Sequence, residues 1–208
     1  MAPQRKTFPR LFLSRADPYR LTGDRVFLRA PERGDYEAWA SLRAGSRDFL
    51  SPWEPSWPPD AVSRTSFRAR VARYAEDWRT DQAYNFFIFA LDETLIGGIG
   101  LSNIRRGVSE TASLGYWVGE PYARQRYMTS ALPLVVDFGF ERLGLHRLEA
   151  ACLPSNIPSR SVLTRTGFQQ EGYAREYLCI AGKWQDHLLF AILRRDREAP
   201  GEVTPALR

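Results

Sequence analysis

Hydrophobic and polar residues alternate along the chain with two different spacings, which predict a succession of strands and helices. Short apolar runs predict strands at residues 24–31, 83–92, 94–106, 112–119, 146–153, 173–180 and 183–195. Apolar residues that recur every three or four positions predict helices at residues 34–44, 62–78, 127–144 and 156–168. Residues 49–60, rich in proline and tryptophan, are expected to form a structured loop.

The order of these elements predicts how the strands are connected. Three consecutive strands between residues 83 and 119 predict an antiparallel meander. A helix separates the strand that reaches Val118 from the strand that begins at His146, and this arrangement predicts a parallel crossover. The expected fold class is therefore α/β (α+β), with a mixed sheet in a single domain.

The composition is that of a soluble globular protein. The chain has 208 residues, of which 44% are hydrophobic and 25% are charged, so disorder is not expected. No apolar run approaches about 18 residues, so we expect no transmembrane helix and no membrane partner. The net charge of +5 suggests an anionic partner, such as a phosphate-bearing cofactor, RNA or a ribosome surface, although it would also serve solubility alone.

Cysteine and histidine residues indicate neither a disulfide framework nor a metal centre. Cys152 and Cys179 are interpreted as buried apolar thiols in a reducing compartment, which we expect to be the cytoplasm. His146 and His187 lie beside neither a nucleophile nor a second ligand, so no metal is expected.

The junction between strand 112–119 and helix 127–144 is a candidate anion site. A helix N-terminus offers free N–H groups and a partial positive charge, both of which suit phosphate. Folds that bind a pyrophosphate there usually place glycine at the junction, but this segment has Arg124 and Arg126 and no glycine before Gly139. On these grounds alone the junction is either a phosphate site or one of the many that stay empty.

Three blocks of sequence resemble a known family. They are LGYWVGEPYARQRYMTSAL (114–132), LHRLEAACLPSNIPSRSVLTRTGFQQEGYAREYL (145–178) and GKWQDHLLFAIL (182–193), and LSPWEPSW in the first loop is also typical. From about Leu21 to Arg194 the chain resembles the GNAT acyltransferase superfamily, and more closely the ribosomal-protein-alanine N-acetyltransferases of the RimJ type. The resemblance implies a GNAT-like, mostly antiparallel central sheet flanked by helices. We expect an acetyltransferase domain at residues 21–195, between a basic N-terminal arm (1–20) and a flexible C-terminal tail (196–208).

The resemblance implies acetyl-CoA as the co-substrate, bound at this junction. The family's cofactor pattern, Arg/Gln-x-x-Gly-x-Gly/Ala, falls on residues 123–128, where Arg126 replaces the middle glycine. A positive φ at Arg126 would cost about 1–2 kcal/mol of strain, whereas a negative φ would tolerate a Cβ, and the guanidinium is able to pair with phosphate. The implied cofactor-binding residues are the main chain of Tyr116, Trp117 and Val118, the N–H groups of Arg124, Gln125, Arg126, Tyr127, Met128 and Thr129, and Asn156 and Ser159.

Acetyl transfer in this fold is direct, from a thioester to an amine. The reaction needs a donor for the oxyanion, a proton donor for the thiolate and a base for the amine. A backbone N–H near Val118 is the expected oxyanion donor. Many relatives use a tyrosine as acid at the position of Leu163, so Ser159 is the expected substitute, although it is equally well interpreted as a helix-turn serine. The candidate bases are Glu110, Glu120 and Glu176, which spacing does not favour over surface carboxylates or a water chain.

Candidates for the acceptor side have structural alternatives of equal or greater weight. Trp53 and Trp57 would form a rigid lip over the acceptor, or would cover the core. His187 would line the same side, or would be a hydrogen-bonded strand residue. Asn156 would contact the pantetheine amide, cap its helix, or do both. The basic residues of helix 62–78 would contact RNA or an acidic protein, or form a solvated face: Arg64, Arg68, Arg70 and Arg73.

The expected function is acetyl-CoA-dependent N-acetylation of an α-amino group, in the first place the N-terminal alanine of a ribosomal protein. Two alternatives stay open: an acetyltransferase for a small amine or amino acid, and a non-catalytic acyl-CoA-binding module, which Arg126 and Leu163 would explain. The expected partner is an acceptor protein N-terminus or a small amine, without direct DNA binding, and the expected state is a monomer or a homodimer.

Overall fold

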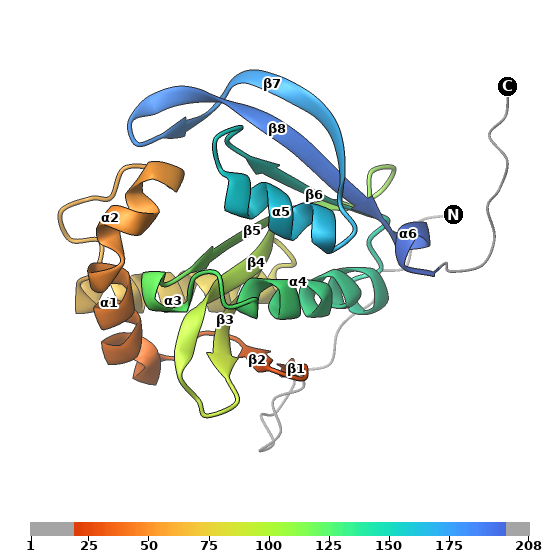
Figure 1. The fold of residues 1–208 in the computed structure, drawn as a ribbon. Coiled ribbons are helices and arrows are strands. Elements are labelled where there is room, and N and C mark those ends of the chain that lie inside the picture. The colour runs from red at the N-terminus through yellow and green to blue at the C-terminus, as the bar shows by residue number, and fades with distance from the viewer. Residues whose placement is uncertain (1–18, 199–208) are drawn as a thin grey trace, which may run out of the picture.

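The computed structural model of the protein describes residues 19–198 (Figure 1). Most of the expected N-terminal arm (1–20) and of the expected C-terminal tail (196–208) lies outside the described residues. The last strand ends at Leu193, two residues earlier than predicted, and the chain continues as helix α6 (Arg194–Glu198).

Within the described residues the strands form one mixed sheet in the order β1-β2-β3-β4-β5-β6-β8-β7. The strands are β1 (Leu21–Thr22), β2 (Val26–Arg29), β3 (Tyr84–Ala90), β4 (Leu95–Arg105), β5 (Thr111–Val118), β6 (Arg147–Cys152), β7 (Gln169–Ile180) and β8 (Lys183–Leu193). Every neighbouring pair is antiparallel except β5 and β6, which are parallel. The meander β3-β4-β5, the crossover from β5 to β6 and the mostly antiparallel mixed sheet are confirmed. β1 was not predicted because two residues are too few to show a pattern.

Helices cover both faces of the sheet. The α-helices of the described part are α1 (Tyr36–Gly45), α2 (Arg47–Leu50), α3 (Arg64–Arg79), α4 (Tyr127–Asp137), α5 (Ile157–Arg165) and α6. Single turns of other helix types are η1 (Arg33–Asp35), η2 (Ser51–Trp53), η3 (Glu120–Tyr122) and the π-type turn η4 (Phe138–Arg142), which continues α4. The expected loop 49–60 is therefore wrong at its start, where α2 and η2 are helical: Pro52 occupies one of the first positions of η2, where its missing N–H does no harm, and the other prolines follow this turn.

The period of two along the strands divides the core into two layers. Phe86 of β3 is buried in the same cluster as Leu132 of α4. Its neighbour Phe87 is buried on the other face, with Trp39 of α1 and Phe67 of α3. The sheet thus has α4 on one face and α1 and α3 on the other (Figure 1).

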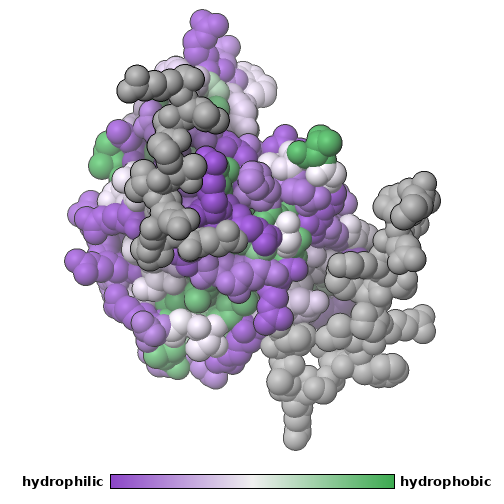
Figure 2. Space-filling model, turned by 90° about the vertical axis from the view of Figure 1, so that its right-hand side faces the viewer, coloured by the Kyte–Doolittle hydropathy of each residue, from purple (hydrophilic) through white to green (hydrophobic). Residues whose placement is uncertain are grey.

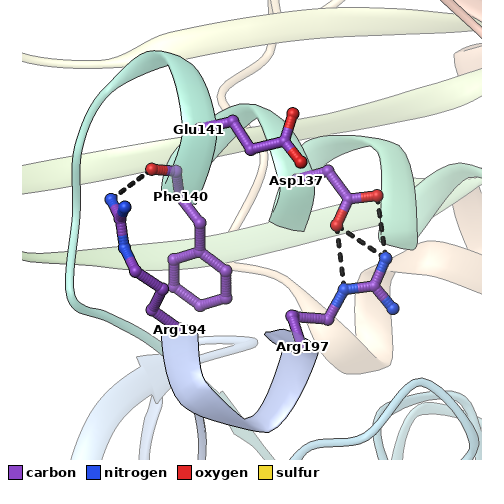
Figure 3. A pocket seen from close by; sticks show the side chains of 5 residues that line it. All are labelled: Asp137, Phe140, Glu141, Arg194 and Arg197. Atoms are coloured by element: carbon purple, nitrogen blue, oxygen red, sulfur yellow. Dashed lines mark hydrogen bonds and ion pairs between the residues drawn. The ribbon is translucent and has the colours of Figure 1, made fainter. Parts of the chain in front are cut away.

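The far end of α4 is joined to α6 by charged groups (Figure 3). Arg197 Nε lies 2.8 Å from Asp137 Oδ1, and Arg194 donates to the carbonyl of Phe140. With Glu141 these residues line a cavity of about 210 Å³. Because it lies at the C-terminal end of α4, this joint is remote from the junction that follows β5.

The surface that carries α6 is mostly hydrophilic. Its visible hydrophobic patches are small and separated from one another (Figure 2). Among residues 19–198, every helix is too short or too polar to span a bilayer.

The parallel strands β5 and β6 pair over only part of their length. Their paired positions are Thr111 with Arg147, Ala112 with Leu148, and Ser113 with Glu149. Beyond these positions the two strands continue without pairing to each other. We call the opening between residues 114–118 and residues 150–152 the β5–β6 wedge. It leaves main-chain donors and acceptors of β5 without a strand partner on that side.

Candidate active site

The main chain of β5 directs its N–H groups into the wedge at alternate residues. Gly119 N donates to Ile96 O of β4 at 2.9 Å. In an antiparallel ladder, alternate residues direct their N–H and C=O groups to opposite sides. Tyr116 and Val118 therefore direct theirs toward the wedge, where they are able to bind an extended group or a developing oxyanion.

The loop between β5 and α4 has left-handed backbone at two arginines. Arg124 has φ 61°, and Arg126, the N-cap residue of α4, has φ 65° and ψ 9°. Non-glycine residues rarely adopt such angles, and Arg126 costs about 1–2 kcal/mol of strain for this reason. Its side chain makes no capping hydrogen bond, so the first N–H groups of α4 have no partner from the cap. Of the two alternatives for Arg126, the structure has the positive φ.

Contacts from the surrounding chain hold this loop in shape. Arg25 Nη1 donates to Gln125 O at 3.1 Å, and Gln125 Nε2 donates to Pro121 O at 2.6 Å. The ring of Tyr122 packs edge-on against Tyr127 at the start of α4, with ring centroids 6.2 Å apart. Arg124 and Arg126 are exposed, so the backbone defines the loop while its cationic groups face solvent.

Tyr116 of β5 and Ser159 of α5 approach each other. The Tyr116 hydroxyl lies 2.8 Å from Ser159 Oγ and 3.3 Å from Ser159 O. Burial raises the pKa of Tyr116 well above its usual range. Asn156 Oδ1 accepts from Ser159 N at 3.0 Å and so caps α5, which is the capping geometry that the sequence offered as one of its readings.

Cys152, which was not expected near the site, ends β6 beside this pair. Burial raises the pKa of its thiol, and a hydrogen bond from Ser159 opposes that rise. Ser159 thus lies near a sulfur atom in this part of the molecule. Leu163, at the position of the family's tyrosine, is 1% exposed and belongs to the core, so no side chain from that position reaches the wedge.

A partly buried ion pair lies beside Trp117, near the end of β5. Arg43 donates to both carboxylate oxygens of Glu54, at 2.8 and 2.6 Å, and Trp57 Nε1 donates to Glu54 Oε2 at 2.8 Å. The Arg43 guanidinium lies between two indole rings, 4.1 Å from the centroid of Trp57 and 4.7 Å from that of Trp117. We call Arg43, Glu54, Trp57 and Trp117 the arginine–tryptophan cluster.

This cluster fixes the first loop beside the end of β5. Arg43 contacts both Trp57 of this loop and Trp117, the residue that precedes Val118 in β5. Trp53 is partly buried in η2 and is not part of the cluster. Sequence patterns did not indicate Arg43 or Glu54, because neither residue type nor spacing distinguishes them from surface charges.

The β7–β8 hairpin closes over the same side. Ala181 N, in its turn, donates to Glu54 O at 2.9 Å. His187 is 3% exposed, with Nδ1 2.9 Å from Gln185 O and its ring 5.7 Å from that of Tyr177. These contacts are those of a hydrogen-bonded strand residue, which was the expected alternative for His187.

The candidate bases lie at different ends of the sheet. Glu110 precedes β5, roughly 25 Å from Val118 at about 3.3 Å per residue, and is bound to Arg106 and to Gly107 N. Glu120 follows β5, and its N–H donates to Ser46 Oγ at 2.9 Å. Glu176 lies in an irregular part of β7 with φ 45°.

The position of Glu176 relative to the wedge follows from strand register. Cys152, the last residue of β6, pairs with Leu188, which pairs with Tyr173. The bulge that contains Glu176 therefore extends beyond the C-terminal end of β6, the end at which the wedge opens. Asp186 accepts from Glu176 N at 2.8 Å and holds the bulge, and bulges commonly redirect side chains in this way.

Two further observations concern small ligands. A cavity of about 300 Å³ adjoins the first turn of α4 and is lined in part by Thr129, Pro133 and Arg165. Within the part of the chain that the structure describes, His, Cys, Asp and Glu side chains form no group of three or more suited to a metal ion.

Comparisons with known proteins agree with this geometry. The chain is 38% identical over 179 residues to the probable N-acetyltransferase YjcK of Bacillus subtilis (strain 168), covering 86% of this chain and 99% of the relative. It is 34% identical over 188 residues to the ribosomal protein uS5-alanine N-acetyltransferase of Escherichia coli (strain K12), covering 89% of this chain and 96% of that protein.

Among solved structures, the chain matches that of Mycobacterium smegmatis RimJ in complex with CoA-disulfide, with a TM-score of 0.79 and 34% identity over 84% of each chain. A family model described as an acetyltransferase (GNAT) domain matches residues 25–169. The chain therefore belongs to the GNAT acetyltransferase family, whose members are N-acetyltransferases that use acetyl-CoA.

Proposed function

We propose that this N-acetyltransferase acetylates the N-terminal alanine of a ribosomal protein, in the cytoplasm, with acetyl-CoA as the donor. The observation that carries the acceptor is the 34% identity, over 96% of its length, to an enzyme named for the alanine of ribosomal protein uS5. The net charge of +5 supports the proposal, because the ribosome is a polyanion.

The cofactor loop and the wedge would bind acetyl-CoA together. The N–H groups of residues 124–129 would bind the pyrophosphate, and the guanidinium groups of Arg124 and Arg126 would add positive charge. The N–H and C=O groups that Tyr116 and Val118 direct into the wedge would pair with the pantetheine arm. Asn156 uses its Oδ1 to cap α5, and its side-chain NH2 would donate to the pantetheine amide.

The residues at the end of the wedge would each serve one need of the reaction. Acetyl-CoA supplies an acetyl group activated as a thioester. The Val118 N–H would donate to the thioester oxygen, on which negative charge develops. Ser159 would donate to the leaving sulfur. Glu176 would accept the amine proton, in preference to Glu110, which lies at the other end of β5 and is already bound to Arg106.

Three classes of acceptor distinguish this proposal from its alternatives. Peptides that begin with alanine, the same peptides with a blocked N-terminus, and a panel of small amines are each incubated with the full chain and acetyl-CoA, and the products are identified by mass spectrometry. We expect acetylation of the free alanine peptides alone. Exclusive acetylation of small amines would replace the ribosomal acceptor, and acetyl-CoA binding without any turnover would indicate a non-catalytic module.

A further inference from the structure

The Tyr116 side chain has no role in the reaction as described so far, yet it connects β5 to helix α5. Its ring leaves β5, and its hydroxyl lies 2.8 Å from Ser159 Oγ on α5. The two residues are 43 positions apart in the chain, so the contact depends on the tertiary fold. It lies at the depth at which β5 and β6 no longer pair.

The direction of this hydrogen bond determines what Ser159 is able to do. A serine hydroxyl has one proton and two lone pairs. If Ser159 donates to Tyr116, its only proton is used. If Tyr116 donates to Ser159 Oγ, the serine proton is free to point at a third atom.

The geometry favours donation by Tyr116 to Ser159 Oγ. Of the two acceptors that Ser159 offers, Oγ is nearer, at 2.8 Å. Ser159 O lies at 3.3 Å and is within helix α5, whose geometry gives it the N–H of residue 163. Ser159 Oγ is therefore the better acceptor for the Tyr116 proton, and burial, which raises the pKa of Tyr116, keeps that proton on the phenol.

Ser159 also lies close enough to the sulfur of Cys152 to lower the pKa of that thiol, against the larger effect of burial, which raises it. A serine that receives a proton from tyrosine and directs its own toward sulfur has the arrangement needed to stabilise a departing thiolate.

We propose that Tyr116 is a positioning residue that donates to Ser159 Oγ and thereby aims the Ser159 O–H at the sulfur of the leaving CoA. This proposal rests on the proposed acetyl transfer. The amine nitrogen forms a bond to the acetyl carbon, the carbon–sulfur bond breaks, and its electron pair goes to sulfur. Ser159 donates a hydrogen bond to that thiolate without giving up its proton, the amine proton goes to the base, and solvent protonates free CoA.

The proposal explains how the chain dispenses with a tyrosine at position 163. Leu163 is buried in the core, and Tyr116 reaches the same serine from β5. A tyrosine thus still takes part, but as the partner of a serine and not as an acid.

A double-mutant cycle tests the proposal. Tyr116→Phe, Ser159→Ala and the double variant are compared with the natural chain by the rate of CoA release, measured chromatographically at saturating acetyl-CoA. We expect Tyr116→Phe to lower kcat by about fivefold to tenfold, with KM for acetyl-CoA within about twofold. In the Ser159→Ala background the same change is expected to alter kcat by less than about twofold, because Tyr116 acts through Ser159.

Tyr84→Phe is the matched control for loss of a buried tyrosine hydroxyl. Tyr84 is 9% exposed, and its hydroxyl donates to Asp81 at 2.9 Å, away from the wedge. Its replacement is expected to lower the melting temperature but to leave kcat unchanged. An unchanged or higher kcat for Tyr116→Phe, or an equal fall in both backgrounds, would overturn the role of Tyr116.

CoA release can also be measured without an acceptor, and this measurement tests the role of Tyr116 independently of the proposed ribosomal acceptor. Water then attacks the same thioester, and the leaving group is unchanged. If no ribosomal peptide is acetylated, the proposed acceptor is wrong. The double-mutant cycle at Tyr116 and Ser159 can still be measured from the rate of acetyl-CoA hydrolysis or of acetyl transfer to a small amine. A chain that releases no CoA under any of these conditions contradicts both.

Discussion

On the side of β5 that we propose for the cofactor (the cofactor side), the loop at residues 123–126 is shaped by its backbone and leaves two arginines exposed. On the side that we propose for the acceptor (the acceptor side), the partly buried Arg43 lies between two indoles and is paired with Glu54. Both sides therefore use arginine, but only the second uses it to hold the structure together. A site made of N–H groups tolerates a change of side chain, whereas a site made of interlocked side chains does not.

The tolerance of the cofactor side is visible in Arg126 itself. The family's pattern has glycine there, and the chain keeps the left-handed backbone that glycine favours. The N–H groups at the start of α4 are thus still directed outward, at a cost of about 1–2 kcal/mol. The acceptor side has no such freedom, since Arg43, Glu54 and both indoles depend on one another.

The largest effect on kcat is expected at the pairing of β4 with β5, because β5 borders both the cofactor side and the acceptor side. Gly97 of β4 pairs with Val118, and a Cβ at Gly97 would lie 2.3 Å from Trp117 O and 3.0 Å from Val118 Cα. Gly97→Ala should force β4 and β5 apart at the oxyanion donor and lower kcat by at least about 100-fold. Steady-state kinetics on the purified variant measure this loss.

Gly115→Ala is the control for that experiment. Gly115 belongs to the same pair of strands, and a Cβ there meets nothing within 4 Å. Its kcat should stay within about threefold of the natural chain. A Gly97→Ala enzyme that is as active as the Gly115→Ala enzyme would show that the close approach of the two strands does not position Val118.

The next largest effect is expected from a change on the acceptor side alone, at Glu54. Glu54→Gln removes the charge opposite Arg43, whose side chain is 13% exposed, and leaves a largely buried cation without a full counter-charge. We expect a loss of about 2–3 kcal/mol in the free energy of unfolding. The KM for the acceptor peptide should rise about tenfold while that for acetyl-CoA stays constant, as measured by denaturant titration and two-substrate kinetics.

Glu37→Gln tests whether burial causes that loss. Glu37 pairs with Arg64 at the surface, where the two side chains are 77% and 52% exposed, so its removal should cost less than about 1 kcal/mol. Equal losses for the two variants would mean that the arginine–tryptophan cluster holds the acceptor side no more firmly than any surface pair.

A smaller effect, with an informative sign, is expected at Arg126. The backbone already has positive φ, so Arg126→Gly brings no better geometry for phosphate and removes a cation. We expect acetyl-CoA affinity to fall about threefold to tenfold. Relief of the backbone strain should nevertheless raise the free energy of unfolding by about 1 kcal/mol. In a chain of this size, that gain raises the melting temperature by about 2–4 °C.

Glu93→Gly is the control for that experiment, because it relieves the same kind of backbone strain away from the cofactor loop. Glu93 has φ 67° in the turn between β3 and β4, so its replacement should raise stability without changing acetyl-CoA affinity in calorimetric titration. A gain of affinity in Arg126→Gly would indicate that the arginine obstructs the pyrophosphate, and the cofactor side would then be less tolerant than proposed.

The same contrast explains what the sequence allowed us to predict. Strands such as β3 and β4 have apolar runs, and the helix after β5 has a clear apolar pattern, so the sheet and its crossover were predictable from local signals. The family motif located Asn156 and Ser159. Neither the apolar pattern nor the motif indicated the φ angle of Arg126, because φ is a property of the folded backbone. Both a positive and a negative φ therefore stayed open for this residue.

Contacts between distant side chains were the part that the sequence did not reveal. Arg43 meets Trp117 only after the sheet has formed, and the bond between Tyr116 and Ser159 joins β5 to helix α5 across 43 positions of the chain. Glu110 and Glu176 are indistinguishable as isolated carboxylates, and only strand register separates them. Local patterns therefore predict elements, whereas the acceptor side depends on how those elements meet.

The last expected effect concerns the chemical reactivity of the two cysteines and not catalysis. Cys152 is buried as expected, with 6% exposed at the wedge. The expectation that Cys179 is also buried is wrong, since it lies exposed on the β7–β8 hairpin, at the outer edge of the sheet. At pH 7, iodoacetamide should modify Cys179 at least about tenfold faster, because burial blocks access to Cys152 and raises the pKa of its thiol. The raised pKa lowers the thiolate fraction at a given pH, so the rate at Cys152 should keep increasing into the alkaline range.

Mass spectrometry resolves the two sites, because tryptic cleavage at arginine and lysine places Cys152 and Cys179 in different peptides. Added CoA should slow the modification of Cys152 further, since the wedge would then be filled, and should leave Cys179 unchanged. Protection of Cys179 instead would place CoA on the hairpin side of the molecule, and the assignment of the two sides of β5 would have to be reversed.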